Sequence, residues 1–95
     1  MFPISNTYAV SLAGAVRAEL ARRGRPGSDL AYILGVSRAT AYRRLNGSDA
    51  LDADEIEKIA TALGMKEADL LESADFGRRI AERATGEHAR TERAA

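Results

Sequence analysis

GSDLAYILGVSRATAYRRLNG, residues 27–47, is the most informative part of the sequence for predicting the fold. Its pattern predicts two short helices joined by a three-residue turn, because Gly35 can take the positive φ that ends a first helix. Ser37 is a suitable N-cap for the second helix, and Gly47 is suited to closing it. We therefore expect the second helix to run from Ser37 to Asn46 after a sharp turn.

The first helix of this pair has a short apolar face made of Leu30, Ala31 and Leu34. Gly27 or Ser28 is the expected N-cap, which predicts about two helical turns ending at Leu34. Ala31 is small at the position where the two helices should cross. The pair therefore has the form of a helix-turn-helix.

An apolar stripe precedes this pair and predicts a helix from about Thr7 or Ser11 to Arg23. Residues 1–6 are expected to form a flexible arm. After the pair, Asp52 with Glu55 three residues later has the form of a capping box, and Gly64 ends the helix that it starts.

A short fifth helix is expected over residues 66–73, and no segment has the alternation of a strand. The fold class is therefore all-α, with five short helices in one helix-turn-helix unit over residues 7–75. Residues 76–95 are expected to form an amphipathic tail. Phe76 and Ile80 predict a helical extension that packs back on the domain or contacts a second copy, and residues 87–95 are expected to fray.

Charge is segregated along the chain, although the formal net charge is zero. Residues 17–47 hold seven Arg against two acids, residues 48–75 hold nine acids against two Lys, and residues 76–95 hold five Arg against three acids. A phosphate surface responds to the local patch, because fields decay over about 8 Å at physiological salt. This distribution is compatible with one face toward nucleic acid and one face away from it.

Residues 12–71 resemble the Cro and phage-repressor type of helix-turn-helix domain, also called the XRE family. The residues that carry the resemblance are Leu30-Ala31, Leu34-Gly35-Val36-Ser37, Asn46-Gly47, Ile56-x-x-Ile59-Ala60-x-x-Leu63-Gly64 and Leu70-Leu71. The resemblance implies a lambda-repressor-like bundle whose second motif helix enters the major groove of an operator. The sequence departs from the family at Gly27, where Gln is common, and at Ala41 and Arg44, where an aliphatic residue is usual. We expect Leu45 to supply the missing packing.

Both the helix geometry and the resemblance place base contacts at the start of the second motif helix and one turn later. The candidate base-contacting residues are Ser37, Arg38, Ala39 and Arg43. The candidate phosphate-contacting residues are Gly27, Ser28, Thr40, Tyr42, Arg44 and Asn46. For Tyr42, packing in the core is an equal alternative.

The function that the resemblance implies is control of transcription, by repression at a double-stranded DNA operator, in a phage, prophage or bacterium. A homodimer on DNA is expected, with Phe76 and Ile80 as the contact. The alternatives are an accessory protein of recombination or excision, and a protein-interaction module such as an antitoxin that uses the acidic residues 48–75.

Other classes are disfavoured by composition. No cysteine is available for a disulfide or a thiolate metal site, and His88 stands alone in the tail. The acids around Asp52 are interpreted as caps, so no metal, cofactor or small-molecule ligand is expected. The sequence shows no set of nucleophile, base and orienting residue that would indicate an enzyme. The start of the chain does not resemble a signal peptide, and no segment is apolar enough to cross a membrane, so a cytoplasmic protein is expected.

Overall fold

The computed structural model describes residues 8–94, with side chains over residues 8–84, and this part of the chain is helical without strands. The five helices are α1 (Tyr8–Arg22), α2 (Asp29–Leu34), α3 (Arg38–Asn46), α4 (Ala53–Leu63) and α5 (Glu67–Ala94). The all-α prediction with five helices is confirmed. The arm expected over residues 1–6 lies outside the described residues. No described helix is both long and apolar enough to span a membrane.

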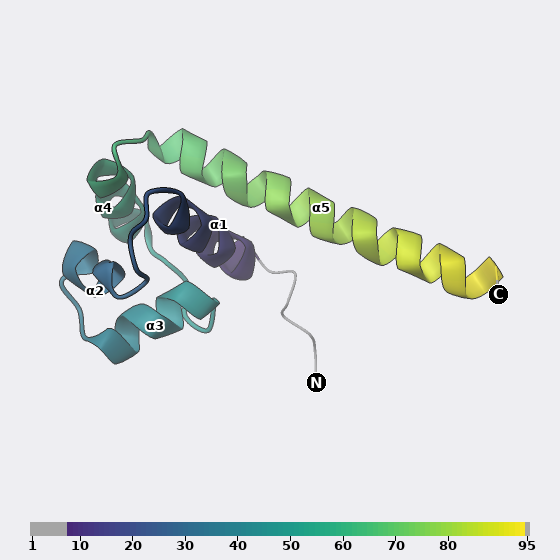
Figure 1. The fold of residues 1–95 in the computed structure, drawn as a ribbon, viewed down its shortest axis with the longest axis horizontal. Coiled ribbons are helices and arrows are strands. Elements are labelled where there is room, and N and C mark those ends of the chain that lie inside the picture. Colours follow the sequence, from purple (N-terminus) through teal and green to yellow (C-terminus); the bar gives the residue numbers. More distant parts are fainter. Residues whose placement is uncertain (1–7, 95) are drawn as a thin grey trace.

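Helix α1 lies at the centre and contacts α3, α4 and α5, while α2 packs on α3 and α4 (Figure 1). The largest fully buried side chains come from four different helices: Val16, Leu20, Leu30, Ile59 and Leu70. Each lies on the apolar stripe of its own helix, so packing in one shared core holds these short helices together.

Side-chain caps start α3 and α4 where the sequence predicts them. Ser37 Oγ accepts from Thr40 N at 3.1 Å. Asp52 Oδ1 accepts from Glu55 N at 2.8 Å, and Glu55 Oε1 accepts from Asp52 N at 3.0 Å, which completes the capping box. The sequence-based interpretation of Asp52 and Glu55 as a capping box is therefore confirmed.

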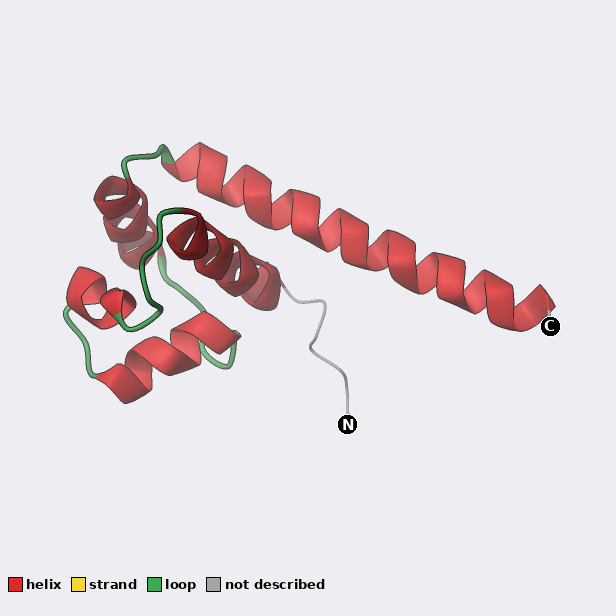
Figure 2. Ribbon diagram, viewed as in Figure 1, coloured by secondary structure: helices red, strands yellow, loops and turns green. Residues whose placement is uncertain are grey.

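The last helix differs from its prediction, because α5 is one continuous helix of 28 residues. The expected boundary between residues 75 and 76 falls inside it, and residues 87–94, where the sequence analysis expects fraying, belong to the same helix. Leu70 and Ala74 anchor the first part in the core. Beyond them, ion pairs one helical turn apart and a composition rich in Ala, Glu and Arg continue the helix past the bundle (Figure 2).

Glu19 is a buried carboxylate in α1 that bonds Arg23, and Arg23 in turn bonds α4. Arg23 Nη1 donates to Glu19 Oε1 at 2.6 Å, while Arg23 Nε donates to the Leu63 carbonyl at 3.0 Å. Arg22 also pairs with Glu19. The hydrogen bond from Arg23 is the main cause that lowers the pKa of Glu19 below its ordinary value of 4.5, against the opposing effect of burial.

The pKa of Glu19 predicts how stability depends on pH. Glu19→Gln should lower the free energy of unfolding by about 1–3 kcal/mol at pH 7, since Arg23 loses its charged acceptor. Because the pKa of Glu19 is lower in the folded state than in the unfolded state, this contribution is complete above about pH 4.5 and is lost as the pH falls through the folded value. Urea unfolding of both proteins between pH 3 and pH 7, with roughly half-unit steps, tests this.

The control for this experiment is Glu57→Gln, because Glu57 is exposed on α4 and makes no ion pair with any described residue. A difference between wild type and Glu19→Gln that stays constant down to pH 3, or that Glu57→Gln reproduces, would contradict the role given to Glu19.

Gly47 sets how closely α3 approaches α1. Its φ is 82°, and a β carbon at this position would lie 2.9 Å from Val10 Cα. Gly35 has a similar φ of 69° but has open space around it. Gly35→Ala should therefore cost only the backbone strain of about 1–2 kcal/mol, whereas Gly47→Ala should cost clearly more because the Val10 backbone must also move. Thermal unfolding of both variants measures this difference, and equal losses would refute the close-contact explanation.

Candidate nucleic-acid interface

The turn between α2 and α3 has the geometry that the sequence predicts. Gly35 N donates to the Ala31 carbonyl at 2.9 Å, and Val36 N donates to the same carbonyl at 3.1 Å. Gly35 is left-handed, which reverses the chain and lets Ser37 start α3. Ser28 is the N-cap of α2, one of the two residues that the sequence predicts, but its side chain makes no cap hydrogen bond. Backbone bonds from Asp29 N to the Pro26 carbonyl and from Leu30 N to the Gly27 carbonyl, both 3.0 Å, start it instead.

The four candidate base-contacting residues lie together on the outer face of α3 and its cap. Ser37, Arg38, Ala39 and Arg43 are all exposed, while the opposite face of the helix buries Ala41. Within the described residues, Arg38 makes no ion pair or hydrogen bond, so its guanidinium is free to bind a ligand. Arg43 is also exposed, but its Nε donates to Asp49 Oδ2 at 2.7 Å.

Arg44, which the sequence analysis lists as a phosphate contact, is bound to carboxylates of the protein itself. Its Nε donates to both Glu55 oxygens, at 3.1 and 3.3 Å, and its Nη1 donates to Asp49 Oδ2 at 3.2 Å. Its side chain is only 20% exposed. The Glu55 hydrogen bond is the main cause that raises the pKa of Arg44, so this group stays charged. Arg44 therefore ties the end of α3 to the start of α4, and it would have to leave both carboxylates to reach a phosphate.

Leu45 takes the buried position that Arg44 leaves, as the sequence analysis expects. It is 9% exposed and belongs to the same core cluster as Ala41. A β carbon on Gly27 would lie 3.0 Å from Leu45 Cδ1. Because Leu45 fills the packing position that Arg44 does not, it leaves little room at the start of α2. This accounts for Gly27 at the position where the resemblance would place Gln.

The other candidate phosphate-contacting residues border the same face. Ser28 is exposed beside half-buried Gly27, and Tyr42 is 67% exposed, so core packing of Tyr42 is wrong. Thr40 Oγ1 accepts from Ser37 Oγ at 3.0 Å, which ties its hydroxyl to the cap. Asn46 is exposed, and its Oδ1 accepts from Ser48 N at 2.8 Å.

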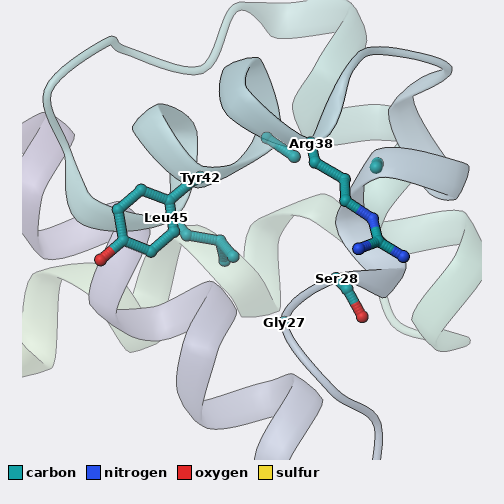
Figure 3. Close-up of a pocket in the computed structure, with 7 residues that line it drawn as sticks. Gly27, Ser28, Arg38, Tyr42 and Leu45 are labelled. Carbon is teal, nitrogen blue, oxygen red and sulfur yellow. The ribbon is translucent and has the colours of Figure 1, made fainter.

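An apolar hollow of about 330 Å³ separates the start of α2 from α3 (Figure 3). Arg38 and Tyr42 stand on its rim, at the two sides of the view. Its lining residues are Gly27, Ser28, Ala31, Arg38, Ala41, Tyr42 and Leu45. Small residues at positions 27 and 41 leave this space open, so the interface combines charged groups with an apolar recess.

Two surface residues near this face are absent from the sequence-based set. Tyr32 is almost fully exposed on α2 and shares a surface depression with Arg38. In the sequence, its position outside the apolar stripe of Leu30 and Leu34 indicates that it is exposed. Asp49 contacts two arginines of α3 from the loop before α4. No local pattern identifies that contact, because the loop conformation creates it.

Comparison with known proteins agrees with this geometry. A family model described as the Cro/C1-type helix-turn-helix DNA-binding domain matches residues 16–75. Two crystal structures of the clp gene regulator ClgR from Corynebacterium glutamicum are similar in fold. One is 24% identical, with a TM-score of 0.77, and the match covers 88% of each chain. The other is 25% identical, with a TM-score of 0.65, and covers 72% of this chain and 88% of that one. Comparison with curated proteins finds no match.

Proposed function

The chain belongs to the Cro/C1-type helix-turn-helix DNA-binding family, and on that premise we propose that it is a sequence-specific regulator of transcription that places α3 in the major groove of double-stranded DNA. The observation that carries this proposal is the exposed end of α3, where Arg38 has no partner among the described residues and stands beside exposed Ser37 and Ala39. The major groove admits an α-helix, and arginine can bind guanine O6 and N7 together.

We assign base contacts to Ser37, Arg38, Ala39 and Arg43. We assign phosphate contacts to Gly27 and Ser28 at the start of α2 and to Thr40, Tyr42 and Asn46 of α3. Arg44 is left out of this set, because its ion pairs with Glu55 and Asp49 give it a role in joining α3 to α4.

We further propose that binding at an operator represses transcription in a bacterium or a phage, since a protein that covers a promoter blocks polymerase by occupancy alone. The likeness to a bacterial gene regulator supports a regulatory role over an accessory role in recombination. The family match also extends through α4, beyond the helix-turn-helix itself, and favours the same choice.

Selection of bound sequences from random DNA, followed by affinity measurement across a salt series, tests the DNA-binding proposal. Specific binding should weaken steeply with salt, since each phosphate contact releases counterions. Binding that is independent of salt, or a complete failure to enrich any sequence, would instead favour a protein-interaction module.

Arg38→Ala tests the assignment of base contact on α3. The variant should bind the selected site about 1–3 kcal/mol more weakly and lose its preference at one base position, because the lost contact is to a base edge. Lys58→Ala is the control, since it removes one positive charge from the exposed surface of α4. If Arg38→Ala instead weakens all sequences equally and lowers the salt slope by about one, Arg38 contacts phosphate.

We also propose that the protein acts on DNA as a homodimer joined through the distal part of α5. Phe76 is 59% exposed and Ile80 is 48% exposed, one helical turn apart on a helix that extends beyond the bundle (Figure 1). Two copies would place their α3 helices on half-sites about one helical turn, ~34 Å, apart.

The double variant Phe76→Ser with Ile80→Ser should weaken self-association by more than about tenfold, since each apolar side chain that leaves the interface costs on the order of 1–3 kcal/mol. Sedimentation equilibrium measures the dissociation constant directly. Tyr32→Ser is the matched control, because it removes an exposed aromatic group from α2. A wild-type protein that stays monomeric and selects one undivided half-site would disprove the dimer.

A further inference from the structure

We propose that Asp49 is a positioning residue for base recognition, holding Arg43 so that its two terminal guanidinium nitrogens point to a guanine. The inference rests on the proposed function, since it assumes that Arg43 contacts a base. It concerns an acidic residue at the edge of a surface that would meet DNA, where a negative charge by itself weakens binding.

The contact between Asp49 and Arg43 uses Nε of Arg43 and leaves its terminal nitrogens for a base. Asp49 Oδ2 accepts from Arg43 Nε at 2.7 Å, and the terminal nitrogens of Arg43 donate no hydrogen bond to any described residue. The Arg43 side chain is 53% exposed, so these nitrogens are accessible. Guanine presents O6 and N7 as a pair of acceptors, which two terminal guanidinium nitrogens can meet together.

The backbone holds the Asp49 carboxylate in place relative to Arg43. Asp49 N donates to the Arg43 carbonyl at 3.2 Å, so the loop is bonded to the same residue that the side chain contacts. Asn46 Oδ1 accepts from Ser48 N at 2.8 Å, and Gly47 is pressed against Val10. The turn after α3 is thus held at several points, which distinguishes this pair from a mobile surface ion pair.

A second arginine donates to the same oxygen of Asp49. Asp49 Oδ2 also accepts from Arg44 Nη1 at 3.2 Å, and Arg44 is itself bound to Glu55 of the α4 capping box. The hydrogen bond from Arg43 is the main cause that lowers the pKa of Asp49. The carboxylate therefore stays ionised and remains a strong acceptor at neutral pH. The direction of Arg43 is linked through these contacts to the start of α4.

Restricting a long arginine side chain before binding has a measurable consequence. Arg43 loses rotamer freedom when it pairs with Asp49, so less freedom is lost when it meets a base. A positioned guanidinium also distinguishes guanine from other bases better than a mobile one, because both hydrogen bonds must form together. Asp49 should therefore affect sequence preference more than total affinity.

Three variants separate positioning from a simple effect of charge. Asp49→Ala removes both the acceptor and the charge, whereas Asp49→Asn removes the charge and keeps an acceptor oxygen. Asp54→Ala is the control, because Asp54 is an exposed acid at the start of α4 that makes no ion pair with any described residue. Dissociation constants are measured for the selected site and for sites in which each guanine is replaced in turn, at one fixed salt concentration.

We expect Asp49→Ala to lower the preference for one guanine about tenfold and to leave the other positions unchanged. Asp49→Asn should lose less of this preference, and Asp54→Ala should lose none. In an Arg43→Ala background, Asp49→Ala should have no further effect at that guanine. In the free protein, the NMR signal of the Arg43 Nε–H group should shift in Asp49→Asn, which reports the contact without DNA and in a variant of nearly the same size.

Other outcomes overturn the inference in distinguishable ways. Equal gains in affinity for all sites with Asp49→Ala and Asp49→Asn, at unchanged preference, would make Asp49 only a source of repulsion. If wild type selects a sequence but Arg43→Ala keeps every base preference, this inference fails and the proposed function stands. If wild type shows no sequence preference at all, both fail.

Discussion

The position of α3 depends on its contact with α1, because α3 buries only Ala41 and Leu45 among its nine residues. A helix of this length is not stable alone in water, so tertiary contacts must both form it and orient it. Gly47 allows the end of α3 to lie directly against Val10. Arg17 donates to the Leu45 carbonyl and so satisfies a backbone group that the end of a helix leaves without a partner. The orientation of the proposed DNA-contacting face follows from these contacts.

The second anchor of α3 is polar where the family resemblance would place an aliphatic side chain. Arg44 bonds Glu55 where both side chains are mostly shielded from water, and it also bonds Asp49, whose side chain is 40% exposed. Such a pair adds little net stability compared with apolar packing, but removal of one partner leaves a charge without compensation. Because Glu55 also completes the capping box, the start of α4 and the end of α3 share one carboxylate. Two elements that the proposed DNA-binding function needs in register are thereby coupled.

The long last helix combines two different roles along one element. Its first part is a core helix, with Leu70 and Ala74 fully buried. Its distal part leaves the bundle, and its stability there comes from helix-favouring residues and from pairs such as Asp75 with Arg79 at 2.7 Å. The apolar periodicity of the sequence predicts the first part well, because a buried helix needs an apolar stripe. The same periodicity predicts the second part poorly, since an exposed helix needs no such stripe.

The fold class, the presence of five helices and most of the helix ends can be predicted from the sequence. Gly35, Ser37 and the Asp52–Glu55 box act through their own backbone and near neighbours, so local chemistry was sufficient to place them. The family resemblance also follows from residues that are close together in the chain. Which arginines of α3 form ion pairs depends instead on the tertiary structure. Arg38, Arg43 and Arg44 are the same residue type on one short helix, and their differences arise from Asp49 and Glu55, which the loop after Gly47 brings beside two of them. A contact across a loop depends on the loop's path in space, and neither helical periodicity nor residue spacing contains that path.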